Sequence, residues 1–310
     1  MKVLMTVTLI FFATFAMAAS DDQPIGLISM VKGSVQIQHA GSKSPVQAKM
    51  ADLVGPGDHL ITGAGGEAIF LYCPDSRSAR LPASGEVTFT NAALQVNKGK
   101  LADERKIAGC RLPSTLALSA SSQQQVGLMK TRGLELSLHS PSQGVMIATP
   151  QPDFRWTPVK DAVKYEVTVR DREENTLYKA TVTGTEVAYP ASAPKLQPGQ
   201  KYWWRVTAIG TEDKLVDAGD FFRTMPEDKA REFKASEADL KKQIAASPQD
   251  NGPRILLAFL YEDNGMYDAA ACTYDALDRQ AAGNPTWIKS QLNTMLNKLG
   301  WDKADCGSRR

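Results

Sequence analysis

The spacing of the apolar residues changes once along this chain of 310 residues, near residue 226. Before that point they recur at every second position, in short runs that turn residues interrupt roughly every eight to twelve positions. After it they recur at the spacing of amphipathic helices. A period of two is typical of half-buried β-strands. We therefore expect a mainly β, multi-domain protein that ends in a small α-helical bundle.

Residues 22–112 contain the first alternating runs, separated by turns such as residues 55–58 and 63–66. The glycines of these turns supply the positive φ that such turns require. Short strands punctuated in this way predict an all-β sandwich or barrel. The alternating apolar residues are Ile28, Val31, Val35, Ile37, Ala68, Phe70, Tyr72, Val87, Phe89, Leu94 and Val96.

This segment contains three short sequence strings, which are Gly33-Ser34-Val35, VGPGDHLITG at residues 54–63 and GEAIF at residues 66–70. Together they resemble the FecR family, a periplasmic β-domain best known from iron-uptake signalling. Where that family usually carries Asp-Gly-Ser after the last string, this chain has Pro74-Asp75-Ser76. The resemblance implies a FecR-like β-domain over residues 22–112, with an accessory role in transport signalling as one alternative.

Residues 136–225 alternate again, with Trp156 early in the segment and the turn residues 196–199 just before Tyr202. A tyrosine in this place can cap its own loop through its hydroxyl. The segment resembles a fibronectin type III or similar immunoglobulin-like module, which implies a β-sandwich. The residues expected to face its core are Val163, Tyr165, Val167, Val169, Trp204 and Val206.

The same alternation turns Trp203 and Arg205 outward. Trp and Arg dominate interface hot spots, and an outward indole ring can also stack on a sugar. These two residues are therefore our first candidates for binding a partner. The alternative is that Trp203 packs against the helical segment or against residues 113–135, a Ser/Gln-rich stretch that we interpret as a linker.

Residues 226–305 show helical spacing, and Asn284-Pro285 is a good helix start. Part of the segment resembles one tetratricopeptide repeat, carried by Leu257, Ala258, Tyr261, Gly265, Tyr267, Ala270 and Tyr274. Because stacked repeats normally need about three copies, we expect flanking helices to complete a small bundle. Tyr261 and Tyr267 are candidate partner-binding residues, and the alternative is that they belong to the core of the repeat.

Residues 1–19 begin with a basic residue, continue with an apolar run and end near Ala16-Met17-Ala18. This order is typical of a cleaved secretory signal peptide. The run is shorter than the roughly 20 apolar residues that cross a bilayer. We expect a periplasmic or secreted protein with no stable membrane span after cleavage.

The chain has four cysteines, which permit three pairings. Export makes disulfides plausible, and the order along the chain favours Cys73–Cys110 and Cys272–Cys306. Each would close a loop of about 35 residues, worth on the order of 3–4 kcal/mol. Four buried thiols are the alternative.

The charges and motifs argue against several classes of function. With 36 basic and 34 acidic residues, the chain lacks the clustered positive charge of a nucleic-acid binder. We find no catalytic motif, metal-ligand spacing or cofactor motif, so we predict no catalytic residue, metal or cofactor. Asp58 is expected to hydrogen-bond the backbone of its own turn. The charged runs at residues 103–106 and 172–174 are expected in solvated loops.

These patterns favour an exported, non-enzymatic binding or scaffold protein of the bacterial envelope, with a protein or envelope partner. A carbohydrate- or peptidoglycan-binding role is an alternative, because the outward Trp203 suits a glycan. An enzyme is the third possibility, which would require convergent carboxylates or histidines in a deep pocket.

Overall fold

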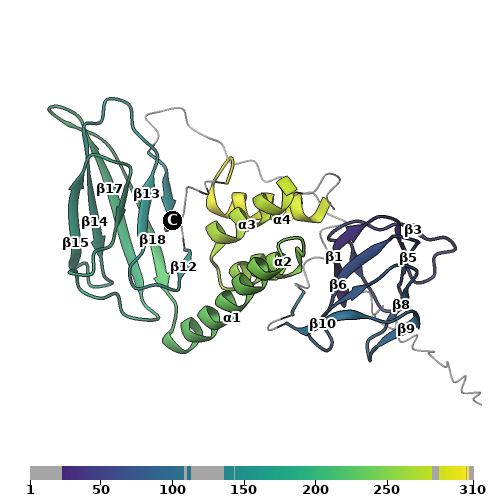
Figure 1. Cartoon of the computed structure of the whole chain (residues 1–310). Helices are drawn as coiled ribbons and strands as arrows, with labels where there is room; N and C mark the ends of the chain where they lie inside the picture. Colours follow the sequence, from purple (N-terminus) through teal and green to yellow (C-terminus); the bar gives the residue numbers. More distant parts are fainter. Residues whose placement is uncertain are drawn as a thin grey trace, which may run out of the picture.

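The computed structural model describes residues 23–107, 110–112, 136–142, 144–280, 286–304 and 306. The expected signal peptide, the expected linker at 113–135 and the helix start at Asn284-Pro285 lie outside these residues. The described part is a mainly β, multi-domain protein with four helices near its C-terminal end (Figure 1). No helix of this part is long and apolar enough to cross a membrane.

The first domain consists of two five-stranded antiparallel sheets, ordered β10-β7-β6-β1-β4 and β3-β2-β5-β8-β9. Their strands are β1 (Gly26–Lys32), β2 (Val35–Gln38), β3 (Val46–Gln47), β4 (Leu53–Val54), β5 (His59–Thr62), β6 (Glu67–Tyr72), β7 (Arg77–Leu81), β8 (Glu86–Phe89), β9 (Leu94–Lys98) and β10 (Ala102–Lys106). The expected all-β fold of this segment is confirmed.

The core of this domain contains the inward residues of the alternating strands, such as Ile28, Val35, Phe70 and Phe89. The rings of Phe70 and Phe89 meet edge to face, with centroids 5.1 Å apart. The expectation of a loop at residues 103–106 was wrong, because this run forms strand β10, although Asp103, Glu104 and Lys106 are exposed to solvent as expected. Strand pairing with β7 holds it in the sheet.

The second domain is a sandwich of a three-stranded sheet, β11-β13-β16, and a five-stranded sheet, β12-β18-β17-β14-β15. Its strands are β11 (Leu138–Ser140), β12 (Met146–Ile147), β13 (Asp153–Trp156), β14 (Lys164–Arg170), β15 (Thr176–Val182), β16 (Glu186–Ala188), β17 (Lys201–Ile209) and β18 (Lys214–Thr224). All pairings are antiparallel except that of β12 with β18.

Aromatic rings fill the interior of the sandwich. Phe154 and Trp204 lie with their ring centroids 4.9 Å apart, and Trp156 packs against Tyr165 at 5.5 Å. The hydroxyl of Tyr202 accepts a hydrogen bond from the backbone N–H of Gln197 at 2.7 Å, so the expected cap of its own loop is confirmed.

One expectation for the sandwich core was wrong. Val163 is 49% exposed, whereas Tyr165, Val167 and Val169 are buried. The strand β14 begins only at Lys164, so the alternation that buries the later residues does not extend to Val163.

The helices are α1 (Glu227–Ala246), α2 (Gly252–Asp263), α3 (Tyr267–Gln280) and α4 (Thr286–Leu299). Their apolar faces meet in a shared core that includes Phe233, Phe259 and Met295. Helix α2 ends as expected at Asn264 and Gly265, and Gly265 has a φ of +69°, the left-handed conformation typical of the position after a helix.

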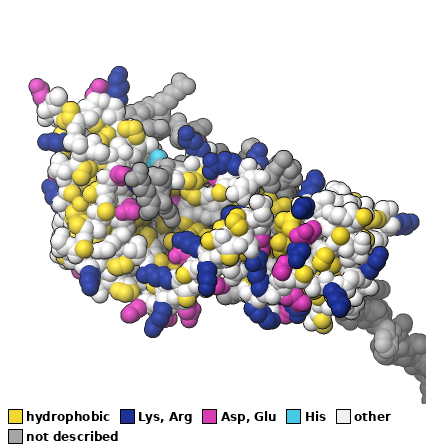
Figure 2. Space-filling model, viewed as in Figure 1, with side chains coloured by type: hydrophobic (Ala, Val, Ile, Leu, Met, Phe, Trp, Pro, Cys, Tyr) yellow, Lys and Arg dark blue, Asp and Glu magenta, His cyan; other side chains and the backbone are white. Residues whose placement is uncertain are grey.

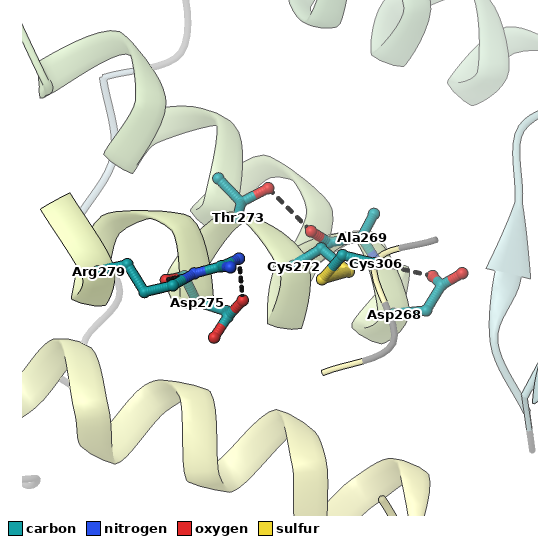
Figure 3. The surroundings of a disulfide bond; sticks show 7 residues. All are labelled: Asp268, Ala269, Cys272, Thr273, Asp275, Arg279 and Cys306. Atoms are coloured by element: carbon teal, nitrogen blue, oxygen red, sulfur yellow. Dashed lines mark hydrogen bonds and ion pairs between the residues drawn. A yellow bond between two sulfur atoms is a disulfide. The ribbon is translucent and has the colours of Figure 1, made fainter. Parts of the chain in front are cut away.

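Both expected disulfides are present, so the thiol alternative was wrong. Cys73 follows β6 and bonds to Cys110, which follows β10, with their Cα atoms 5.0 Å apart. Cys272 in α3 bonds to Cys306, beyond the end of α4. Figure 3 shows this second bond on α3, near the ion pair that joins Asp275 and Arg279.

The helices lie between the two β-domains, although they follow both in the sequence (Figure 1). On one side, the indole N–H of Trp287 donates a hydrogen bond of 2.8 Å to the carbonyl oxygen of Ala51 in the first domain. A Cβ on Gly252 would lie only 2.8 Å from Leu71 Cδ2, so glycine at the start of α2 permits close contact with β6.

On the other side, the backbone N–H of Met146 donates to the carbonyl oxygen of Gly265 at 3.1 Å. The rings of His139 and Trp301 also meet there, with centroids 5.8 Å apart. One buried apolar cluster includes residues of the first domain, the sandwich and the helices. The first domain, the sandwich and the helices therefore pack against one another through this shared cluster.

Candidate partner-binding face

Trp203 lies on the outer face of the five-stranded sheet, near the start of β17. It is 38% exposed, and it is the most exposed aromatic residue among those that the structure describes. The neighbouring Trp204 is only 1% exposed, and its indole N–H donates to the carbonyl oxygen of Pro141 at 3.0 Å. The predicted outward position of Trp203 is therefore confirmed.

The strand register identifies the neighbours of Trp203. Arg170 of β14 lies directly opposite it on one side, and Phe221 of β18 on the other. Two residues earlier on β17, Lys201 lies opposite Arg223. We call this group of outward residues the Trp203 face, and it consists of Arg170, Lys201, Trp203, Arg205, Phe221 and Arg223.

Lys201 packs over both rings of this face. Its Nζ lies 3.7 Å from the ring centroid of Phe221 and 4.6 Å from that of Trp203. A cation over an aromatic face is attracted by the ring quadrupole, by about 0.5–1 kcal/mol at exposed sites. Lys201 therefore covers Phe221 more closely than Trp203.

Arg205 also points outward as predicted, but its guanidinium is already engaged by a carboxylate. Its guanidinium forms an ion pair with Asp217, which also pairs with Lys214. The pKa of Asp217 is lowered mainly by the hydrogen bond from Lys214, with further contributions from Arg205. Arg205 therefore adds to the face a planar side chain that already has an ion-pair partner.

The two candidate tyrosines belong to the helices and not to the Trp203 face. Tyr261 is 5% exposed, its ring packs against Phe233, and its hydroxyl donates to Glu237 at 2.7 Å. Its ring is therefore part of the bundle core and does not offer a surface to a partner. Tyr267 is half-buried at the start of α3, where Lys298 Nζ lies 4.3 Å from its ring centroid.

A buried polar pair also lies in the helices. The hydroxyl of Tyr274 donates to the Glu262 carboxylate at 2.8 Å. Burial raises the pKa of Glu262, and burial together with the charge of Glu262 raises the pKa of Tyr274 well above its usual range. The hydrogen bond between these two buried side chains links α2 to α3.

Sequence reasoning missed part of the surface. Lys201 and Phe221 were not selected, although the alternation that turns Trp203 outward does the same for Lys201, and one residue of the pair Phe221-Phe222 must face outward. It also missed a cleft of about 340 Å³ between residues 147–150, residues 195–198 and α1. No local pattern predicts this cleft, because three distant segments form it.

The described residues contain no group of three or more His, Cys, Asp or Glu side chains that could hold a metal ion. On the face of the molecule in Figure 2, basic and acidic side chains are interspersed over all three parts, without a large basic field. The arrangement at the Trp203 face can provide aromatic contact and hydrogen-bond donation.

Residues 135–224 match the family model of the Rha78A-like N-terminal immunoglobulin domain. Among solved structures, the sandwich is similar to FN3tt, with 16% identity over 29% of this chain and 95% of that chain (TM-score 0.23). It is similar to an Fn3-like protein from Clostridium thermocellum, with 16% identity over 29% of this chain and 88% of the other (TM-score 0.22).

A third similarity is to the Streptomyces avermitilis α-L-rhamnosidase complexed with L-rhamnose, with 16% identity over 30% of this chain and 10% of that enzyme (TM-score 0.24). All three scores are below 0.5, so the assignment of the second domain rests on the family model and on its own strand order. The comparison with curated proteins finds no match. The chain is thus a mainly β, multi-domain protein that contains an immunoglobulin-like domain.

Proposed function

We propose that this protein is an exported, non-enzymatic binding and scaffold protein of the bacterial envelope. The observation that carries the proposal is the exposure of Trp203, at 38%, on a strand whose other aromatic residues are buried. A tryptophan that stays partly in water is costly to leave uncovered, and Trp is enriched in interface hot spots. A partner that covers this ring accounts for its position.

The proposal includes a FecR-like identity for residues 22–112. Asp58 of the G-D-x-L-x-T-G block supports it, because this side chain is nearly buried and organises the turn. Its carboxylate accepts hydrogen bonds from the backbone N–H groups of Gly55 at 2.9 Å and Ala40 at 2.8 Å. Asp58 thus gives the G-D-x-L-x-T-G block a structural role, which is to hold the turn in place.

The proposal also includes a tetratricopeptide-like bundle for residues 226–305, which acts as a spacer. The full burial of the small residues Ala258 in α2 and Ala270 in α3 supports this interpretation. Because the bundle packs against both β-domains, it holds the Trp203 face at a fixed position relative to the first domain. The two disulfides suit the oxidising compartment that export implies.

Affinity capture from envelope fractions tests the proposal. The wild-type protein, Trp203→Ala and Val163→Ala are immobilised at equal density. Val163 is the matched control because it is an exposed apolar residue of the same domain outside the Trp203 face. We expect the wild type and Val163→Ala to retain the same envelope component, and Trp203→Ala to lose most of it. Equal retention by all three proteins contradicts the proposal.

A glycan is the second candidate for the component that this face binds. The observation that favours it is the combination of one exposed ring with cations that form no ion pair within the part of the chain that the structure describes. These positive charges also imply that the ligand carries negative charge.

A further inference from the structure

We infer that the Trp203 face binds a polyanionic glycan, a chain of sugar units that carry carboxylates. This inference rests on the proposed function and specifies the class of ligand for the same face. Its basis is the layout of charges and rings on β14, β17 and β18.

Three cations of the face lie around Trp203. Within the described residues, Arg170, Lys201 and Arg223 form no ion pair, and Arg170 and Arg223 are exposed. A cluster of three uncompensated positive charges attracts anions and repels cations, and the attraction weakens as salt is added. The ligand is therefore anionic.

The carboxylates further along the same outer face do not neutralise this cluster. Glu166 pairs with Lys179 at 2.9 Å, and Asp217 pairs with Arg205 and Lys214. Both carboxylates are already engaged by other basic residues. They therefore form no ion pair with Arg170, Lys201 or Arg223.

The cations and the open ring are arranged in two rows. One row contains Arg170, Trp203 and Phe221, and the next contains Lys201 and Arg223. Neighbouring strands lie about 4.8 Å apart, and residues on one face of a strand repeat about every 6.8 Å. A ligand that lies flat on Trp203 thus places its substituents within reach of cations on both sides.

Gly219 leaves room for the Arg205 side chain beside the rings. It lies opposite Arg205, and a Cβ added there would lie 3.7 Å from Arg205 Nε. The guanidinium of Arg205 therefore lies over Gly219. An extended ligand that passes over this part of the sheet meets that planar guanidinium beside the rings.

The sheet geometry favours a glycan over an acidic peptide. Strand β17 is paired on both sides, with β14 and with β18, so its backbone has no free edge to which a peptide strand could add. An amphipathic helix needs an apolar groove, and this face has two rings among cations. Sugar rings combine flat C–H faces, which stack on indole, with carboxylates, which pair with Lys and Arg.

Affinity electrophoresis of the full-length mature protein tests the inference. The gel contains polygalacturonate, with fully methyl-esterified polygalacturonate and poly-glutamate as comparison polymers. We expect polygalacturonate to retard the wild type, and added salt to weaken the retardation. We expect about tenfold weaker binding for Trp203→Ala and for the double variant Lys201→Gln/Arg223→Gln. Lys164→Gln removes one exposed cation at the far end of β14 and should bind like the wild type.

Three results would overturn the inference. They are no retardation by polygalacturonate, equal retardation by the esterified polymer, and equal retardation by poly-glutamate, which would indicate recognition of charge without sugar. If any of these occurs while envelope capture still depends on Trp203, the ligand class is wrong and the proposed function stands. If capture does not depend on Trp203, the proposed function itself is wrong.

Discussion

The guanidinium of Arg105 in β10 forms an ion pair with the carboxylate of Asp250, which lies 145 residues further along the chain, between α1 and α2. The Asp250 side chain is fully buried, and its other oxygen accepts the backbone N–H of Gly252 at 2.9 Å. Arg105 also donates to Ser247 Oγ at 3.2 Å. This polar contact joins the first domain to the start of α2, and the hydrogen bond between Trp287 and Ala51 is a second link between the first domain and the helices.

Removing Arg105 should destabilise the contact between the first domain and the helices. In Arg105→Ala the Asp250 carboxylate remains buried without its partner, and a change of this kind costs about 3–5 kcal/mol. Urea unfolding measures the free energy of unfolding. Arg80→Ala is the matched control, because Arg80 pairs with the exposed Asp103 and such a surface pair contributes about 0–1 kcal/mol. Equal losses in the two variants would refute the role assigned to Arg105.

Trp287→Phe should test the second polar contact between the same two parts. The change removes the N–H that donates to Ala51 and leaves a buried carbonyl oxygen without that partner, at a cost of about 1–3 kcal/mol. Trp301→Phe provides the comparison, since the buried indole nitrogen of Trp301 has no hydrogen-bond partner in the described structure. Thermal unfolding should show the larger loss for Trp287→Phe, and the reverse order would contradict this account.

The disulfide between Cys272 and Cys306 should contribute about 3–4 kcal/mol, because it closes a loop with a sequence separation of 34 residues. The double variant Cys272→Ser/Cys306→Ser should lose this amount in denaturant unfolding under oxidising conditions. Cys73→Ser/Cys110→Ser opens a loop of similar length, with a separation of 37, and should lose a similar amount. Unchanged unfolding of both variants would show that the bonds do not constrain the unfolded chain.

The buried Glu262 should make stability depend on pH. Burial raises its pKa in the folded protein above the ordinary value of 4.5, so the folded state binds the proton more tightly than the unfolded state. Its contribution to stability is therefore complete below pH 4.5 and is lost as the pH rises through the raised pKa. Gln in its place still accepts from Tyr274 and cannot ionise.

We thus expect Glu262→Gln to gain in Tm relative to the wild type as the pH increases from 4.5 to 7. Glu232→Gln, on the exposed side of α1, controls for the loss of one carboxylate. A difference in Tm between Glu262→Gln and the wild type that does not change with pH would contradict the assignment.

The sequence predicted those features that depend on local periodicity. Alternation along a strand correctly separated Trp203 from Trp204, because neighbouring side chains of a strand must face opposite sides. The order of the cysteines also predicted the correct pairing, because each disulfide joins cysteines that are neighbours in the order along the chain. The same alternation predicts that the side chain of Lys201, two residues before Trp203, also faces outward.

Other features depend on contacts between distant segments. The contact of the helices with the first domain rests on Arg105, Asp250, Trp287 and Ala51, and the two partners of each bond are far apart in the chain. The charged run that contains Arg105 has the composition of a solvated loop, and only the buried carboxylate opposite it reveals its structural task. Val163 shows that even alternation fails one residue before a strand begins.

The central claim is that the Trp203 face is the surface through which the protein binds its partner. Site-specific photo-crosslinking in cells tests it most directly, with p-benzoylphenylalanine at position 203 and, in a separate variant, at position 163. Illumination should produce adducts of a discrete envelope component from position 203 and none from position 163. An absence of adducts at 203, or the same adducts at both positions, would contradict the account.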